Sequence, residues 1–100
     1  MREATIERHL RRRVKETGGL CWKWVSPGRT GVPDRILIYP SGVIAFVETK
    51  VPGEKERPIQ VLVQSMLVKM GCLVFSSVDS REKVDQVIAE MLRRIPEAKS

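Results

Sequence analysis

The sequence predicts a single α/β domain over residues 1–100, with helices packed against one mixed sheet in the order α-β-β-β-α-β-α. A length of 100 residues suits one compact domain and not two. A hydrophobic fraction of 42% is that of an ordinary globular protein. Segments with helical apolar spacing alternate with short runs of β-branched and aromatic residues, and no internal repeat or long linker separates them.

Three segments have the apolar spacing of helices that pack one face against a sheet. The first runs from about Glu3 to Glu16 and ends at Gly18-Gly19. The second begins at Pro58, a favoured first-turn residue, runs to about Met70 and stops at Gly71. The third is capped by Asp79 or Ser80. The apolar stripes of the first and third helices consist of Ile6, Leu10 and Val14, and of Val84, Val87, Ile88, Met91 and Leu92.

Four shorter segments are predicted to be strands because β-branched and aromatic residues dominate them. In the first strand, Trp22 and Trp24 point to one face, and Cys21, Lys23 and Val25 to the other. The segment Pro40-Ser41-Gly42 is a hairpin turn between the second and third strands. The predicted strands are Leu20–Val25, Arg35–Tyr39, Val43–Val51 and Cys72–Ser77.

Charge and composition limit the partners of the chain. A net charge of +6 favours a polyanionic partner, usually nucleic acid, although simple solubility explains it too and an anionic membrane surface is a weaker option. No stretch approaches the roughly 20 apolar residues of a membrane span, and the charged N-terminus is not a signal peptide, so a cytoplasmic location is expected. Cys21 and Cys72 form no CxxC pair, which argues against structural zinc and favours reduced core thiols.

The residues with the strongest chemical pattern are Asp34, Glu48 and Lys50. Side chains alternate along a strand, so Glu48 and Lys50 share a face while the side chain of Thr49 points away. The Thr49 carbonyl between them offers a further oxygen ligand. An acid and an amine on one strand face can therefore meet one substrate.

The hairpin turn places Asp34 opposite Glu48. If Tyr39 pairs with Val43, paired residue numbers are symmetric about Ser41, which brings the two carboxylates to the same face, with Cβ atoms about 5 Å apart. Carboxylates at that distance repel unless a proton or a cation lies between them, and Mg²⁺ suits an all-oxygen site. A one-residue slip of the register would move Asp34 to the other face.

Neighbouring residues support this placement and supply a third acid. Pro33 suits the start of a strand because it lacks an N–H, and Gly31 relieves crowding where the chain turns toward the site. Glu7 is the expected third acid, beside the apolar stripe of the first helix, and Glu3, one turn earlier, is the alternative; either is also explained as a solvated helix-surface residue. His9 points to another helix face and is expected to be a surface residue.

These residues together resemble the motifs of the PD-(D/E)xK nuclease superfamily and, within it, of the VRR-NUC family in its short stand-alone phage form. The family signature of Gly-x-Pro-Asp, a strand ending in Glu-x-Lys and a downstream Gln matches Gly31–Asp34, Phe46–Lys50 and Gln60. Glu7 to Leu10, ahead of Gly18, is similar to the first acidic motif of the family. The resemblance covers nearly the whole chain and implies a restriction-endonuclease-like fold.

The resemblance implies metal-dependent phosphodiester hydrolysis with Mg²⁺ or Mn²⁺. Asp34, Glu48 and the Thr49 carbonyl would hold the metal, and Glu7 would complete its shell. Lys50 would orient or deprotonate the attacking water and stabilise the transition state, with Gln60 positioning Lys50 or the water. Two departures are noted: Thr49 stands where an aliphatic residue is more usual, and Gln64, one turn after Gln60, leaves open which glutamine faces the metal.

The resemblance also implies a DNA substrate, because stand-alone members look like junction-cleaving endonucleases and some relatives act on flaps. A four-way (Holliday) junction needs two symmetric cuts, so a homodimer would follow, with the last helix or the Trp22/Trp24 face as its interface. A phage-encoded form would act in the cytoplasm of a bacterial host. A non-catalytic basic nucleic-acid-binding module and a small protein-interaction domain remain alternatives. The candidate phosphate contacts are Lys23, Arg29 and the run Arg11, Arg12 and Arg13.

Overall fold

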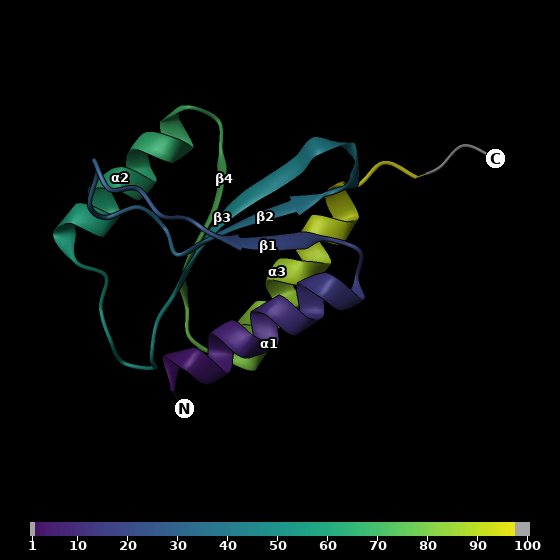
Figure 1. The fold of residues 1–100 in the computed structure, drawn as a ribbon, viewed down its shortest axis with the longest axis horizontal. Helices are drawn as coiled ribbons and strands as arrows, with labels where there is room; N and C mark the ends of the chain where they lie inside the picture. Colours follow the sequence, from purple (N-terminus) through teal and green to yellow (C-terminus); the bar gives the residue numbers. More distant parts are fainter. Residues whose placement is uncertain (1, 98–100) are drawn as a thin grey trace.

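The computed structural model describes residues 2–97, and its elements follow the predicted order α-β-β-β-α-β-α (Figure 1). A short 3-10 turn, Pro40–Gly42, joins the second and third strands as the hairpin prediction required. The helices are α1 (Glu3–Glu16), α2 (Pro58–Lys69) and α3 (Arg81–Arg94). The strands are β1 (Leu20–Lys23), β2 (Arg35–Tyr39), β3 (Val43–Thr49) and β4 (Leu73–Val78).

The four strands form one mixed sheet in the order β1-β2-β3-β4. β1, β2 and β3 run antiparallel to one another, whereas β4 is parallel to β3. A parallel pair needs a crossover connection, and α2 supplies it. The prediction of a single mixed sheet is therefore confirmed.

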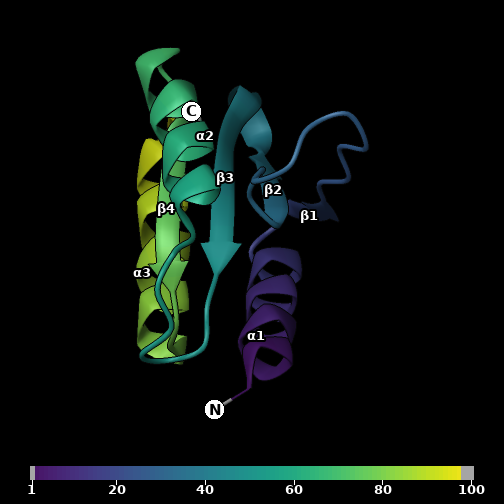
Figure 2. The same cartoon turned by 90° about the vertical axis from the view of Figure 1, so that its left-hand side faces the viewer.

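The helices cover the two faces of the sheet unequally. α1 and α3 lie side by side on one face, and α2 lies on the other face beside β4 (Figures 1 and 2). The core forms between the sheet and the α1/α3 pair, because the apolar stripes of both helices meet every second residue of the strands. Its members are Ile6, Leu10, Val14, Leu37, Tyr39, Ala45, Val47, Val78, Val84, Val87, Ile88 and Met91.

Several boundaries differ from the prediction by one or two residues. β1 and β3 each end two residues early, because the chain leaves the sheet toward loops that position the site. Leu92 was expected in the apolar stripe of α3 but is 40% exposed, since the helix turns that side to solvent. Cys21 and Cys72 are free thiols at intermediate burial rather than full core residues.

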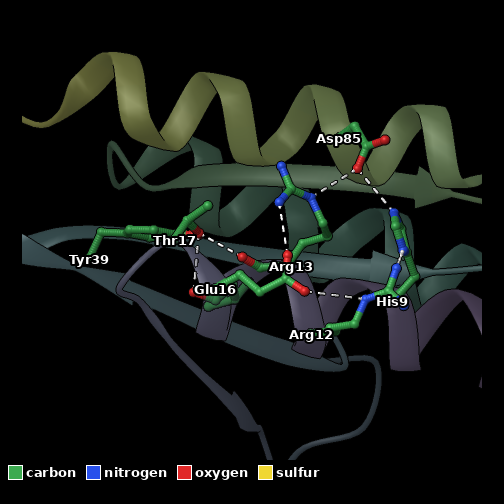
Figure 3. A network of polar contacts seen from close by, with 8 residues as sticks. His9, Arg12, Arg13, Glu16, Thr17, Tyr39 and Asp85 are labelled. Carbon is green, nitrogen blue, oxygen red and sulfur yellow. Dashed lines mark hydrogen bonds and ion pairs between the residues drawn. The ribbon is translucent and has the colours of Figure 1, made fainter.

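A polar network joins α1 to α3 (Figure 3). His9 Nε2 lies 3.0 Å from Asp85 Oδ1, and Arg13 Nε donates to the same oxygen at 3.4 Å. The expectation of a surface His9 was wrong, because its side chain is only 10% exposed against α3.

Both α1 and α3 begin at the end of the molecule where β3 ends (Figure 2). This end is called the site end.

Candidate active site

The hairpin register is the one that the sequence predicted. Tyr39 pairs with Val43, and the ladder continues to Arg35 opposite Val47. One step further along this register brings Asp34 level with Glu48. Asp34 precedes β2 and follows the buried Pro33, so it is fixed at the start of a strand.

The carboxylate of Asp34 is held by the backbone and side chain of Thr49. The Thr49 amide donates to Asp34 Oδ2 at 3.0 Å, and its hydroxyl donates to the same oxygen at 2.9 Å. The expectation that the Thr49 side chain points away from the site was therefore wrong. Two features account for it: Asp34 lies just outside the β2 ladder, and the β3–β4 register shifts by one residue between Val47 and Thr49.

Glu48 is the most buried acid of the site. Its side chain is 2% exposed, and its Oε2 atom has no hydrogen-bond partner among the described residues. Burial raises the pKa of Glu48 to about 9, and the neighbouring Asp34 carboxylate adds to the rise. The carboxylate of Glu56 contributes in the same direction, while Lys50 opposes it. The Asp34 and Glu48 carboxylates therefore need a proton or a cation between them to offset their repulsion.

Lys50 is held at the end of β3 beside Glu48. Its backbone amide donates to the Val78 carbonyl at 3.0 Å, so the β3–β4 pairing extends past the last strand residue. The Lys50 residue is only 7% exposed. Its charge acts on the neighbouring Glu48, and a buried lysine at this position can assist proton transfer.

The structure brings Glu3, and not Glu7, into contact with this group. Thr49 Oγ1 donates to Glu3 Oε1 at 3.2 Å, which links Glu3 to Asp34 through one hydroxyl. Burial, followed by the charge of Asp34, raises the pKa of Glu3. Glu7 instead accepts from Arg35 Nε at 3.3 Å. Glu3, the alternative third acid, is thus the one that lies in the Asp34–Thr49 network.

Both candidate glutamines are buried on α2 but have different partners. Gln60 Oε1 accepts from the Arg57 amide at 2.8 Å, so it also closes the first turn of the helix. Gln64 Nε2 donates to Glu56 Oε2 at 3.3 Å.

The sequence reasoning missed Glu56, which ties the loop after β3 to β4. Glu56 Oε1 accepts from the amide of Ser77 at 2.9 Å and from its hydroxyl at 3.1 Å. Ser77 has a left-handed φ of 52°, and it lies where β4 carries one extra residue opposite Glu48. Bulges of this kind commonly lie next to active sites, and no local sequence signal marks this one.

The predicted phosphate contacts divide into two groups. Lys23 is exposed at the end of β1, and the next residue, Trp24, donates its amide to the Asp34 carbonyl at 2.9 Å. Arg29 lies in the loop that leads to Asp34. Arg11 and Arg12 are exposed in the second half of α1, away from the site end, and Arg12 lies 3.6 Å from Glu16.

The residues of the site fit a divalent cation. Within residues 2–97 no three Asp, Glu, His or Cys side chains are grouped closely enough to hold a metal ion, and Asp34 and Glu48 are the two candidate acidic donors. Two adjacent carboxylates, with one buried oxygen left unpartnered, form an incomplete all-oxygen site of the kind that Mg²⁺ or Mn²⁺ completes. A backbone carbonyl such as that of Thr49 would add a third oxygen.

The raised pKa of Glu48 predicts how the stability of the metal-free protein depends on pH. The unfolded chain releases this proton near pH 4.5, whereas the folded protein keeps it until about pH 9. Between these values the folded state binds more protons, so the free energy of unfolding falls as pH rises. Urea unfolding in EDTA at pH 5, 7 and 9 should show that fall, and Glu48→Gln should flatten it. An equal slope in both proteins would contradict the assignment.

Comparisons with known proteins agree with this fold. No family model matches the chain. A protein of Acyrthosiphon pisum secondary endosymbiont phage 1, named "Putative nuclease p44", is 49% identical over 71 residues, which are 71% of this chain and 76% of that protein. A solved structure of a VRR_NUC domain superposes with a TM-score of 0.81 at 35% identity, over 87% of this chain and 94% of that chain. The chain belongs to the VRR-NUC family of nucleases.

Proposed function

We propose that this nuclease cleaves branched DNA, with a four-way junction as its preferred substrate, in a reaction that depends on Mg²⁺ or Mn²⁺. The observation that carries the metal dependence is the buried Oε2 of Glu48 beside Asp34 and Lys50, which has no hydrogen-bond partner among residues 2–97. A purely structural pair of acids gains nothing from this arrangement, because burying an unpaired carboxylate oxygen costs free energy. A cation between Asp34 and Glu48 would remove that cost.

The proposed chemistry divides between the metal and the protein. A metal bound by Asp34 and Glu48 would lower the pKa of its bound water and screen charge on the phosphate. Lys50 would orient the attacking water or, as the neutral amine, take its proton, and the resulting ammonium group would face the charge that develops on the phosphate oxygens. Glu3 is linked to Asp34 through the Thr49 hydroxyl, and Gln60 closes the first turn of α2.

The charge of the chain suits a DNA substrate. A carboxylate cluster repels phosphates, whereas a net charge of +6 attracts the backbone toward it. Lys23 precedes Trp24, whose amide bonds the Asp34 carbonyl, and Arg29 lies in the loop that leads to Asp34. These two residues are the first candidates for phosphate contacts on either side of the cut. No helix among residues 2–97 is long and apolar enough to cross a membrane.

A panel of DNA substrates tests the proposal. Four-way junction, flap, plain duplex and single strand of matched length are incubated with Mg²⁺, Mn²⁺ or EDTA. We expect cleavage only with a divalent cation, and at least tenfold faster cleavage of the junction than of the duplex. Faster cleavage of the flap would replace the junction as substrate. Salt-dependent binding to all four with no cleavage under any condition would favour a non-catalytic binding module.

A homodimer is part of this proposal, and one face of the sheet supports it. Leu20, Trp22 and Ile44 lie on the same face of the sheet as α2, in the part that α2 does not cover. They are 47%, 57% and 47% exposed. The register places these residues on one face, with Ile38 between Leu20 and Ile44. A contiguous apolar surface of this kind is typical of an interaction site. The last helix offers less, because most of its apolar stripe is already buried.

Trp22→Glu is expected to abolish the dimer. A charge at the centre of an apolar interface stays unpaired when the interface closes, so association weakens by two orders of magnitude or more. Light scattering at micromolar concentration should give twice the 11.4-kDa chain mass for the wild type and the chain mass for the variant. Leu92→Glu on α3 is the matched control and should remain dimeric. A monomeric wild type would count strongly against symmetric junction cleavage.

A further inference from the structure

A small polar pocket lies between α1 and the start of α3, outside the candidate active site. Its volume is about 200 Å³. Five residues line it, and none of them is acidic: Thr5, Arg8, His9, Arg12 and Arg81. It is called the arginine pocket below. Three guanidinium groups from two helices around one small space call for a physical explanation.

Hydrogen bonds fix two residues that line the arginine pocket, His9 and Arg12 (Figure 3). Arg12 Nη2 donates to His9 Nδ1 at 3.1 Å, so the proton of the imidazole is on Nε2, which faces Asp85 at 3.0 Å. His9 is therefore held between an arginine and an acid. The nearby acids already have partners: Asp85 pairs with His9 and Arg13, and Glu16 pairs with Arg12 and Arg13.

Arg8 and Arg81 have no such partners. Neither side chain makes an ion pair or a side-chain hydrogen bond with a residue in the range 2–97, whereas Arg13, Arg35 and Arg93 are all paired with acids. Arg81 is also the first residue of α3, at the positive end of the helix dipole, where a cation is disfavoured. Both arginines are exposed, and an anion between them would offset the repulsion of two like charges that have no acidic partner within residues 2–97.

We propose that the arginine pocket binds a phosphate group and that its ligand is a backbone phosphate of the DNA substrate. A guanidinium group binds phosphate with paired, charge-assisted hydrogen bonds. Arg8 and Arg81 supply two guanidinium groups from different helices. The Thr5 hydroxyl offers a further donor. This inference rests on the proposed function for the identity of its ligand.

The position of the pocket suits a second contact on one DNA molecule. In the first turns of α1, Thr5 lies two residues after Glu3. Arg81 lies three residues after Val78, and the Val78 carbonyl accepts a hydrogen bond from the Lys50 amide. Both α1 and α3 begin at the site end (Figure 2). A strand or junction arm that passes the site end can thus reach the arginine pocket, while the predicted contacts Lys23 and Arg29 lie on β1 and in the loop before β2.

The test compares Arg8→Gln/Arg81→Gln with Arg93→Gln/Arg94→Gln, which removes the same charge from the far end of α3. Binding to a fluorescent four-way junction is measured in Ca²⁺ across a salt series, and single-turnover cleavage is measured in Mg²⁺ at saturating enzyme. We expect the first variant to bind about tenfold more weakly at 0.1 M salt, with a log–log salt slope shallower by about one, as for one lost phosphate contact. Its saturated cleavage rate and the affinity of the control should stay within twofold of wild type.

A second arm separates DNA from a free phosphate compound. Amide resonances of Thr5, His9 and Arg81 are followed while inorganic phosphate is added to the wild type and the variant. Shifts in the wild type alone, together with weaker junction binding by the variant, support the proposal. Phosphate-induced shifts with unchanged junction affinity overturn DNA as the ligand, and no shifts with unchanged affinity overturn the site. Cleavage that depends on Asp34 in the same preparations shows that the proposed function stands even if the arginine pocket does not bind.

Discussion

Asp34→Asn and Lys50→Met should each lower the rate of DNA cleavage roughly 10³-fold, the scale of a lost proton-transfer or metal-binding group. Asn keeps an oxygen that can accept from the Thr49 amide and hydroxyl, so the fold around position 34 is retained while the charge that would bind a cation is removed. Met fills the buried volume of Lys50 without its ammonium group. Single-turnover cleavage of a four-way junction at saturating enzyme measures the chemical step separately from binding.

The control for these variants is Glu90→Gln, which removes a carboxylate from the far part of α3, where it pairs with Arg93 and Arg94. It should cleave like the wild type. Junction affinity measured in Ca²⁺ should also change by less than tenfold in Lys50→Met, since the proposed role of Lys50 lies in the transition state. Cleavage by Asp34→Asn within threefold of wild type would remove Asp34 from the active site.

The central part of the site could be predicted because a tight turn determines its register. Pro40–Gly42 allows only a short connection, with Ser41 and Gly42 both at positive φ, so Tyr39 must pair with Val43. From that pair the alignment of Asp34 with Glu48 follows by counting. The helices were predictable for a similar reason, since a repeated apolar spacing over three or four turns has few other interpretations.

The outer part of the site depends on contacts between segments that lie far apart in the sequence. Glu3 and Glu7 are one helical turn apart, so periodicity cannot rank them; the choice depends on Arg35, which pairs with Glu7 across 28 positions. Strand alternation predicted that the Thr49 side chain points away from Asp34. That prediction assumed that Asp34 is paired within the β2–β3 ladder, whereas the ladder ends at Arg35. The extra residue in β4 at Ser77 is stabilised by Glu56, and that contact is invisible until the loop and the strand are placed together.

The two groups of basic residues illustrate the same limit. The run Arg11 to Arg13 is conspicuous in the sequence, yet Arg12 and Arg13 are paired with Glu16 in the folded protein. Arg8 and Arg81 are inconspicuous and 73 positions apart, but the packing of α1 against α3 brings them to one pocket. The proposed phosphate site therefore follows from the pairing state of each arginine and not from local charge density in the sequence.

Gly31→Ala should lower both stability and activity, because this glycine lies where the loop before Asp34 passes α2. Its φ is +83°, and a Cβ at this position would lie 2.8 Å from the carbonyl oxygen of Ile59 and 2.9 Å from its Cγ1. A left-handed non-glycine residue costs about 1–2 kcal/mol. Overpacking against fixed backbone adds about 1–3 kcal/mol. We therefore expect a loss of about 3 kcal/mol in the free energy of unfolding.

Gly28→Ala is the matched control, because a Cβ there meets no atom within 4 Å. Urea unfolding should leave Gly28→Ala within about 1 kcal/mol of wild type, as for an unstrained loop position. Ile59 immediately precedes Gln60, so relief of the clash in Gly31→Ala must separate the segment that carries Asp34 from the first turn of α2. A shift of about 1 Å in such a site costs about 100-fold in rate. Cleavage by folded Gly31→Ala should fall by that order, whereas equal stability and activity of the two variants would show that the contact with Ile59 does not hold the site together.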